Sequence, residues 1–457
     1  MSAFEALGLR PELLDALKPL GWQALTPIQA RALPQVLAGR DVTGQAMTGS
    51  GKTGAYGLGL LQRLDPGQPT TQALVVCPTR ELATQVAGAL RQLAARLPNT
   101  RVLTVCGGRP FRDQRLGLVR GSHVVVGTPG RLGKHLDRGH LVLSELGVLV
   151  LDEADRLLDM GFSDQVLALV AACSSHRQTL LFSATFPPGV QSLCAAVQST
   201  PVAVRAEEQV APDQLVQRVY TCRREARGAL VGDLLAAEAP TSALVFCETR
   251  QDCLALASEL RRRGASVLAL HGQLSQRSRD EALIQFSNGS VSVLVATNVA
   301  ARGLDVPSLP LVICAELSGA PADHVHRVGR TGRAGQVGLA LSVVCGPREA
   351  RRLARIEAET GCALTRADAP PPCSDLSTLV PHMRTLLLLA GRQDKLRKAD
   401  VVGALVNDGS VPFDAIGRVD LRRRITAVAV HRDHAQAALG FVQRGRIKKK
   451  RVRAKLL

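Results

Sequence analysis

Short apolar runs alternate along the chain with longer helical stretches. In the first half the runs are residues 73–77, 101–106, 123–127, 148–151 and 179–182, and in the second half they are residues 243–247, 266–270, 291–296, 311–315 and 339–344. Because these runs are continuously apolar, they predict strands of sheets that are buried on both faces. Strands that alternate with helices predict parallel α/β architecture. The pattern occurs twice, so we predict two similar α/β domains.

Two polar, proline-containing segments divide the chain. The first is residues 205–213 (RAEEQVAPD), and the second is residues 365–377 (TRADAPPPCSDLS), whose three consecutive prolines are typical of a stiff linker. We therefore predict domains at residues 1–207 and 213–364, a linker at 365–376 and a small domain at 377–457. At roughly 100–200 residues per domain, a chain of 457 residues is long enough for this count.

The region after the linker has a pattern of its own. It predicts an apolar strand at residues 385–390, a helix at 398–406, a basic strand pair around 418–430 and a helix at 434–444. Alternating basic and apolar residues at 451–453 indicate a final strand. These elements are compatible with a small α+β sandwich.

Charge is concentrated in the same region. The formal net charge is +18, of which residues 375–457 carry +11 and the preceding residues carry +7. Such an excess points to a polyanionic partner or an acidic membrane surface. No apolar run reaches the ~20 residues of a membrane helix, and the N-terminus has no signal-peptide pattern. We therefore expect a cytoplasmic protein.

The 11 cysteines are scattered, and none forms a CxxC pair or a Cys/His cluster. This spacing does not suggest zinc, and several cysteines end apolar runs, where a buried free thiol is ordinary. An odd number of unpatterned cysteines also fits a reducing cytosol.

One glycine-rich segment follows an apolar strand and opens a helix. Its residues are Ala46, Met47, Thr48, Gly49, Ser50, Gly51, Lys52 and Thr53. Glycines let backbone N–H groups approach phosphate oxygens, and the helix N-terminus adds a favourable dipole. Lys52 is placed to reach the β- and γ-phosphates, and the Thr53 hydroxyl suits Mg²⁺. A tight turn before a helix is the alternative, but the GKT sequence in this context favours an ATP site.

A carboxylate cluster follows the apolar run 148–151. It places Asp152, Glu153 and Asp155 at the carboxyl end of a buried strand, which is where open α/β sheets bind ligands. Asp152 is positioned to hold Mg²⁺, directly or through water, and Glu153 to orient and deprotonate the attacking water. An acidic helix N-cap is the ordinary alternative. The phosphate loop makes the hydrolytic interpretation stronger.

Arginines in the second half complete the expected chemistry. Phosphoryl transfer needs positive charge on its transition state, and an arginine contributes about 10³–10⁵ in rate. The segment 326–333, HRVGRTGR, has three arginines at three-residue spacing, broken by glycines. Alone, such a run is more often a solvated basic surface. Its place in a second α/β domain suggests an ATP site completed between domains.

The ordered series of motifs over residues 4–333 resembles the DEAD-box RNA helicases of superfamily 2. It begins with Phe4 and the TPIQ segment 26–29, continues through AMTGSGKT (46–53), PTREL (78–82), GG (107–108), TPGR (128–131), DEAD (152–155) and SAT (183–185), and ends with VFC (245–247), residues 276–279, ATNVAARGLD (296–305) and HRVGRTGR (326–333).

This resemblance implies two tandem RecA-like parallel-sheet domains and assigns roles to individual residues. The nucleotide would be bound by Phe4, Thr26 and Gln29, which read adenine, by the phosphate loop, and by Asp305 at the ribose. Arg330 and Arg333 would be catalytic with Lys52, Thr53, Asp152 and Glu153. The RNA backbone would lie along Arg80, Gly108, Thr128, Arg131 and Thr297. Ser183, Ala184 and Thr185 would couple hydrolysis to strand separation.

One position departs from the family pattern. The family usually has Asp where this chain has Asn298. We expect a weakened interdomain contact rather than lost catalysis, because Asp305 remains.

The C-terminal tail, residues 444–455, has eight basic residues and no acidic one, and it includes Lys448, Lys449, Lys450 and Arg451. Phosphate contact is the simplest use of this charge, and a disordered solubilising tail is the alternative. Phe413 and Phe441 are the only aromatic residues of the region, so base stacking of the ordinary kind looks unavailable.

The layout as a whole resembles the bacterial DbpA-like branch of the family. The resemblance rests on the GFSDQV run at residues 161–166, the basic module and the segment 399–405. It implies a C-terminal RRM-like domain that recognises a large-subunit (23S-type) ribosomal RNA hairpin and directs the enzyme to ribosome assembly.

The leading hypothesis is therefore a monomeric RNA-dependent ATPase that needs ATP and Mg²⁺ and locally unwinds short RNA duplexes. One alternative is an RNA chaperone that uses ATP only as a closing ligand; the presence of Glu153, Arg330 and Arg333 favours turnover. A DNA helicase is the other alternative, and the DEAD variant and the TPIQ segment argue against it.

Overall fold

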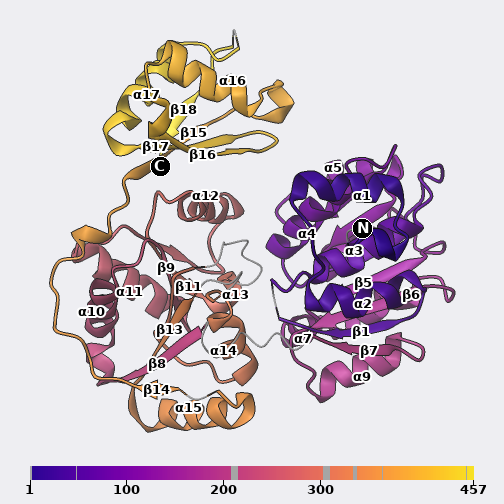
Figure 1. The fold of residues 1–457 in the computed structure, drawn as a ribbon, viewed down its shortest axis with the longest axis horizontal. Coiled ribbons are helices and arrows are strands. Elements are labelled where there is room, and N and C mark those ends of the chain that lie inside the picture. The colour runs from indigo at the N-terminus through magenta and orange to yellow at the C-terminus, as the bar shows by residue number, and fades with distance from the viewer. Residues whose placement is uncertain are drawn as a thin grey trace. The chain divides into compact units, whose positions relative to one another are not determined.

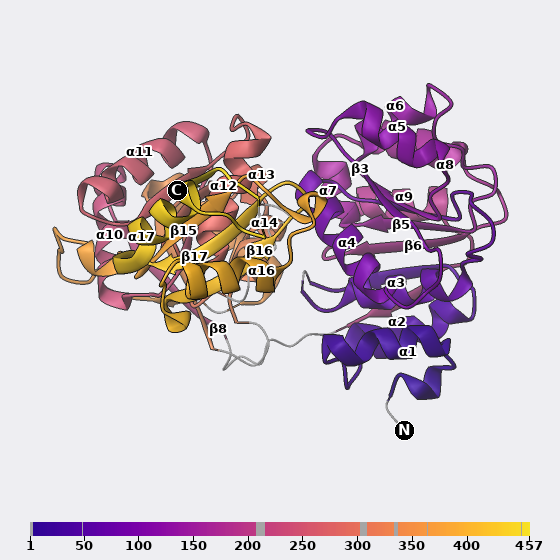
Figure 2. The same cartoon turned by 90° about the horizontal axis from the view of Figure 1, so that it is seen from above.

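The computed structural model describes residues 3–47, 49–206, 215–301, 309–332, 337–362, 364–448 and 450–457 (Figures 1 and 2). Four residues with predicted roles, Thr48, Asp305, Arg333 and Lys449, lie outside these ranges. The chain divides into two compact units, an N-terminal one and a C-terminal one.

The N-terminal unit is built on a parallel sheet of seven strands in the order β3-β4-β2-β5-β6-β1-β7. The strands are β1 (Val42–Gln45), β2 (Ala73–Val76), β3 (Val102–Val105), β4 (Val124–Gly127), β5 (Val148–Asp152), β6 (Gln178–Ser183) and β7 (Val202–Arg205). Because every pair is parallel, all the strands end at the same edge of the sheet. The loops that follow them are therefore brought together at this edge.

Helices cover both faces of this sheet (Figure 2). Those on one face are α1 (Pro11–Leu17), α2 (Pro27–Leu37), α3 (Lys52–Arg63) and α4 (Arg80–Leu93), and those on the other are α5 (Phe111–Val119), α6 (Pro129–Leu136), α7 (Ala154–Asp159), α8 (Ser163–Ala171) and α9 (Pro188–Val197). Neighbouring strand residues alternate between the two cores: Val75 packs in the first and Leu74 in the second. Burial of both faces explains the continuous apolar runs of the sequence.

The C-terminal unit begins with a second parallel sheet, ordered β10-β11-β9-β12-β13-β8-β14. Its strands are β8 (Leu215–Thr221), β9 (Ala243–Cys247), β10 (Val267–Leu270), β11 (Val293–Thr297), β12 (Leu311–Cys314), β13 (Gly338–Val344) and β14 (Thr365–Arg366). Its helices are α10 (Arg227–Glu238), α11 (Arg250–Arg262), α12 (Gln276–Ser287), α13 (Asn298–Ala301), α14 (Pro321–Val328) and α15 (Gly346–Thr360). The repeat of the first architecture confirms the predicted pair of RecA-like domains.

A small antiparallel sheet of order β16-β17-β15-β18 completes this unit. Its strands are β15 (Met383–Leu388), β16 (Ile416–Leu421), β17 (Thr426–His431) and β18 (Ala454–Leu456). Helices α16 (Lys398–Gly403) and α17 (Arg432–Arg444) pack on one face of it and enclose an aliphatic core. This C-terminal module is the predicted α+β domain.

Three details differ from the sequence-based expectation. The pattern missed β7 and β8, which lie at or next to a sheet edge and mix polar with apolar residues. The last strand is Ala454–Leu456 rather than residues 451–453, although Arg453 O accepts a hydrogen bond from Leu389 N–H. Thr365 and Arg366, placed in the linker, pair with β8 instead.

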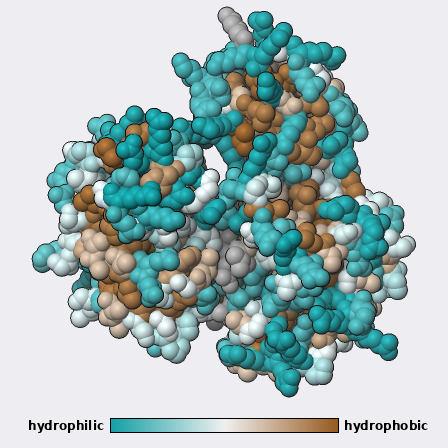
Figure 3. Space-filling model, turned by 180° about the vertical axis from the view of Figure 1, so that it is seen from behind, coloured by the Kyte–Doolittle hydropathy of each residue, from teal (hydrophilic) through white to brown (hydrophobic). Residues whose placement is uncertain are grey.

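The surface shows no single dominant apolar region on the face drawn in Figure 3, where hydrophobic residues are interrupted by hydrophilic ones. Most of the large exposed apolar side chains, such as Val119, Leu254 and Phe413, lie far apart in the sequence. Isolated residues of this kind are normal for a protein surface. No helix within the described ranges is both long and apolar enough to cross a membrane.

Candidate nucleotide and RNA sites

The predicted phosphate loop joins the end of β1 to the start of α3. Gly49 and Gly51 have φ angles of 96° and 95°, in the left-handed region that favours glycine. The Lys52 ammonium is buried and donates a hydrogen bond to Ala46 O at 3.0 Å. The loop thus presents backbone N–H groups and a helix N-terminus, with a lysine held nearby, which is the arrangement that binds phosphate.

The TPIQ segment packs directly against this loop. Gln29, which is 2% exposed, accepts a hydrogen bond from Thr26 N–H at 3.0 Å and donates one to Gly51 O at 3.2 Å. A Cβ on Gly51 would lie 2.7 Å from Thr26 Oγ1, and one on Gly54 would lie 2.4 Å from Gln29 Nε2. Glycine is therefore needed at both positions for the two motifs to meet.

Phe4, predicted to read adenine, lies in the core of the N-terminal unit. Its ring is 1% exposed and tilted against Trp22, with 6.3 Å between centroids. Trp22 in turn lies close to Gly54, since a Cβ there would be 2.8 Å from the indole. Phe4 therefore packs on Trp22, which lies against the start of α3, and its contact with adenine remains a prediction.

Two buried hydroxyls near the loop make no hydrogen bond within the described ranges. They are Thr26 Oγ1 and Ser50 Oγ. A buried polar atom without a partner is costly and usually indicates a ligand or water at that place. Together with Thr53 and Asp152, which offer the oxygen ligands that Mg²⁺ prefers, these hydroxyls fit a bound nucleotide and its metal.

Asp152 ends β5 and is held by a residue that sequence reasoning missed. Tyr56 on α3 is fully buried; its hydroxyl donates to Asp152 Oδ2 at 2.8 Å and lies 3.4 Å from Thr53 Oγ1. Burial raises the pKa of Tyr56, and the Asp152 carboxylate raises it further, so the phenol remains a donor. Burial also raises the pKa of Asp152, while the Lys52 ammonium lowers it.

Glu153, the predicted general base, has an unusual backbone. Its φ of 52° lies in the left-handed region, which is uncommon for a residue with a side chain and clusters at functional sites. Its carboxylate is buried and lies 3.5 Å from the Arg156 guanidinium. The sharp turn lets β5 end in Asp152 and α7 begin at Ala154.

Asp155 connects this cluster to the SAT segment at the end of β6. Its Oδ2 accepts hydrogen bonds from Thr185 N–H at 3.0 Å and Thr185 Oγ1 at 2.9 Å. Asp155 N–H donates to Ser183 Oγ at 3.1 Å, and that hydroxyl donates to Thr185 O at 2.8 Å. The DEAD cluster and the SAT segment are therefore joined by direct hydrogen bonds.

The sheet order separates two groups of predicted residues along the carboxyl edge. The phosphate loop, the DEAD cluster and the SAT segment follow β1, β5 and β6, which are neighbours. The predicted RNA-backbone residues follow the other neighbours, β2, β3 and β4: these residues are Arg80, Gly108, Thr128 and Arg131. A Cβ on Gly107 would lie 2.8 Å from the Arg80 guanidinium, so glycine at this position leaves room for the Arg80 side chain. The two sets thus share an edge without overlapping.

In the C-terminal unit, Arg327 is buried rather than available to a nucleotide. It donates to Asn298 Oδ1 at 2.6 Å, to Glu248 Oε1 at 2.7 Å and to Glu316 O. Asn298 also donates to Asp323 Oδ2 at 3.0 Å, so its amide joins two charged partners within the unit. The effect of Asn298 on interdomain contact remains a prediction.

The other predicted residues of this unit do not share one sheet edge, because Arg330 O accepts a hydrogen bond from Leu309 N–H, just before the amino end of β12. Thr297 ends β11, and Arg330 follows α14 and is 3% exposed. Arg327 is thus held by contacts within the unit, and the catalytic role of Arg330 remains a prediction.

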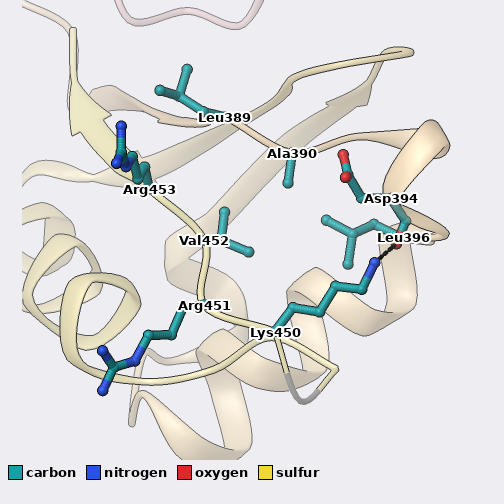
Figure 4. Close-up of a pocket in the computed structure, with 8 residues that line it drawn as sticks. All are labelled: Leu389, Ala390, Asp394, Leu396, Lys450, Arg451, Val452 and Arg453. Atoms are coloured by element: carbon teal, nitrogen blue, oxygen red, sulfur yellow. Dashed lines mark hydrogen bonds between the residues drawn. The ribbon is translucent and has the colours of Figure 1, made fainter.

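The basic tail of the C-terminal module is folded back on it. Lys448 Nζ contacts Asp400 Oδ2 at 3.2 Å, and Lys450 Nζ donates to Asp394 O at 3.0 Å. A cavity of about 180 Å³ lies beside this tail and is lined by residues that include Leu396, Lys450 and Val452. In Figure 4 the side chain of Val452 points toward it, whereas those of Arg451 and Arg453 point away. The tail residues that the structure describes therefore include lysines held against the module rather than extended away from it.

Sequence reasoning missed the roles of Tyr56, Asp155 and Arg327. Tyr56 stands four residues after Lys52, so it lies on the same helix face, and this spacing is the only signal that points to it. The contacts of Asp155 and Arg327 depend on strands and helices that are distant in sequence.

The fold and site together define a nucleotide hydrolase with two RecA-like domains and an additional basic module. Residues 26–193 match the DEAD/DEAH box helicase family, residues 227–335 the helicase conserved C-terminal domain, and residues 385–456 the DbpA RNA binding domain. The chain is 47% identical over 458 residues to the ATP-dependent RNA helicase DbpA of Escherichia coli, covering all of both chains.

Other relatives match the helicase core. The DEAD-box ATP-dependent RNA helicase CshA of Geobacillus kaustophilus is 40% identical over 81% of this chain and 79% of its own. A structure of S. cerevisiae Dbp5 bound to RNA and ADP BeF3 covers 80% of this chain and 96% of its own, at 30% identity and a TM-score of 0.74. The chain therefore belongs to the DEAD-box family of ATP-dependent RNA helicases, in its DbpA-like branch.

Proposed function

We propose that this helicase locally unwinds short RNA duplexes on large-subunit ribosomal RNA, to which its C-terminal module directs it. The observation that carries the proposal is the shared sheet edge, where the buried Asp152 and Glu153 lie beside the strands that present the RNA-backbone residues. The yeast relative was solved with RNA and a nucleotide analogue, which supports both ligands here. The ribosomal target rests on similarity to the E. coli relative and on the module's charge.

Each residue of the ATP site has a proposed task. Lys52 neutralises phosphate charge, and Thr53 and Asp152 hold Mg²⁺, which would supply electrophilic stabilisation of the phosphate oxygens. Tyr56 fixes the Asp152 carboxylate, and Glu153 accepts a proton from the attacking water. Arg330 and Arg333 stabilise charge in the transition state.

We propose that Asp155 couples ATP hydrolysis to strand separation in the bound RNA. Its hydrogen bonds to Ser183 and Thr185 connect the hydrolytic segment to the SAT segment. The RNA path would run along Arg80, Gly108, Thr128 and Arg131, with Thr297 in the second domain. A cytoplasmic monomer remains our expectation.

The test compares ATP hydrolysis by the full chain in the presence of large-subunit ribosomal RNA, an unrelated RNA and DNA. We expect the ribosomal RNA to give the largest stimulation at the lowest concentration, and DNA to give none. A variant with Arg451→Ser and Arg453→Ser should lose this preference, because phosphate contacts carry the affinity. Equal stimulation by both RNAs in the unaltered protein would contradict ribosomal targeting, whereas stimulation by neither would contradict RNA-dependent hydrolysis.

A further inference from the structure

The outer face of the module's sheet is buried although no helix of the module covers it. Leu386 and Val428 point to the inner face and pack with α16 and α17. Strand alternation places Thr385, Leu387 and Ala427 on the other face, together with Ala429. All four are 0–1% exposed. The cover must come from another part of the unit, and Figure 1 shows α12 of the second helicase domain on this side.

Apolar contacts form the centre of this cover. Ile284 of α12 packs with Leu387 and Ala427 in one buried cluster, and Ile425 and Leu457 lie against it. Ile284 is 1% exposed. The cluster is too small to account for a stable interface by itself, so its polar surroundings matter.

Polar contacts surround the cluster and are mutually satisfied. Thr385 Oγ1 lies 2.9 Å from both Asn288 Nδ2 and Ser290 Oγ. Lys455 Nζ contacts the two carboxylate oxygens of Glu281 at 3.0 and 3.1 Å. Burial raises the pKa of Glu281, but hydrogen bonds from Lys455 and Arg277 outweigh it and hold the pKa below its usual value. The buried part of this network, around Thr385 and Ser290, favours one docking geometry.

The segment that leads to the module is also held against the second domain. Leu376 and Leu379 are buried in that domain's core. Leu376 N–H donates to Arg263 O at 2.6 Å, and Cys373 N–H donates to Asp233 Oδ1 at 3.0 Å. The predicted linker is therefore packed along the domain, which shortens the free chain available to the module.

Docking determines which surface of the module is open to RNA. RRM-like domains commonly stack bases on aromatic residues of the central strands. Here those outer positions on β15 and β17 are Thr385, Leu387, Ala427 and Ala429, and they are covered. The cavity lined by Lys450, Arg451 and Arg453 of the basic tail lies elsewhere on the module, whereas Lys455 of the same tail takes part in the docking contact. Meanwhile α12 begins with Gln276 and includes Arg279, residues of the helicase motif series.

We propose that the outer face of the sheet is an intramolecular docking surface for α12. It fixes the module on the second helicase domain, and this fixed position allows RNA held by the module to stimulate ATP hydrolysis at low RNA concentration. The second statement rests on the proposed RNA function. A docked module holds RNA at the helicase core at a higher effective concentration than a module that moves freely on its linker.

The first measurement detects docking without any RNA. A carbodiimide joins contacting ammonium and carboxylate groups directly, so mass spectrometry of the treated full chain should find Lys455 linked to Glu281. Ile284→Glu, which places a charge in the apolar cluster, should abolish this link. Leu254→Glu, on the exposed side of α11, is the matched control and should retain it. Absence of the link in the unaltered protein would overturn the docking surface.

The second measurement tests its consequence. In Ile284→Glu, the RNA concentration for half-maximal ATP hydrolysis should rise about tenfold, while RNA affinity by fluorescence anisotropy stays within about twofold. Asn288→Ala is a milder second variant that keeps α12 apolar and should shift in the same direction. Unchanged stimulation in variants that lose the Lys455–Glu281 link would overturn the coupling. If the unaltered protein shows no RNA stimulation, the proposed function fails, whereas the cross-link still decides the docking surface.

Discussion

The hydroxyl of Tyr56 holds the Asp152 carboxylate at the point where the metal and phosphates are proposed to bind. Both groups are buried, so the hydrogen bond replaces water that the carboxylate would otherwise keep. Asp152 thereby has one oxygen fixed by Tyr56 and the other by Glu153 N–H, which donates at 3.0 Å. We therefore expect Tyr56 to position the Asp152 carboxylate without contacting a phosphate itself.

Tyr56→Phe should therefore lower catalysis without unfolding the protein. A hydrogen bond to a charged group contributes roughly 1.5–3 kcal/mol, so we expect kcat for ATP hydrolysis to fall about tenfold. Tyr220→Phe is the control, since this second tyrosine lies on β8 in the other unit. Steady-state phosphate release gives kcat for both variants. An unchanged kcat in Tyr56→Phe would show that Asp152 needs no such support.

At this scale the sequence predicted where the motif residues lie, because short spacing places them on one loop or at one strand end, and their roles stay predictions. Lys52 and Glu153 could be assigned in this way. It did not predict that Gln29 would contact Gly51, or that Asn298 would join Arg327 and Asp323, because these pairs depend on tertiary packing.

Among the elements, the ends of β5 and β6 are joined by the hydrogen bonds of Asp155. The two strands are neighbours in the sheet. A small movement of the residues beside the proposed nucleotide would therefore reach the SAT segment directly. This contact gives a physical basis for the coupling that the family resemblance implies.

Thr185→Val should separate hydrolysis from unwinding. It removes the hydroxyl bond to Asp155 and keeps the backbone one, so we expect ATP hydrolysis within about threefold and strand release slowed about tenfold. Ser192→Ala, whose hydroxyl bonds only within α9, is the control. Paired measurements of phosphate and strand release decide the matter, and parallel losses in both would argue against coupling at this residue.

Arg327 stabilises the second helicase domain by joining α14 to β9, β11 and β12 through buried contacts. Lysine cannot reproduce the several N–H donors of the planar guanidinium. Arg327→Lys should therefore lower the free energy of unfolding by about 2 kcal/mol or more. For a domain of this size, that corresponds to an unfolding temperature lower by about 4–8 °C. Calorimetry measures the shift. Arg355→Lys on the exposed side of α15 should change the transition little, and equal effects would contradict a special role for Arg327.

The element pattern was predictable where strands are buried on both faces, since continuous apolar runs mark them. It failed for β7 and β8, which carry polar residues near a sheet edge. Composition also predicted a linker at residues 365–376, but it could not show that this segment packs on the second domain, because that depends on partners such as Asp233.

The whole molecule combines the proposed ATP site and RNA path with a basic module that packs on α12. The sequence predicted three domains, yet the contact between the module and α12 has no sequence motif and became visible only in the fold. The central claim is that ATP hydrolysis, dependent on Glu153, drives repeated opening of RNA duplexes.

The most direct test follows strand release from a short RNA duplex and phosphate release in the same reaction, with ATP and Mg²⁺. The unaltered protein should release many strands per enzyme in proportion to phosphate. Glu153→Gln should bind ATP and RNA with normal affinity, release almost no phosphate and free at most about one strand per enzyme, because only its general base is lost. Phosphate release by Glu153→Gln at the unaltered rate, or no ATP-dependent strand release by the unaltered protein, would contradict the account.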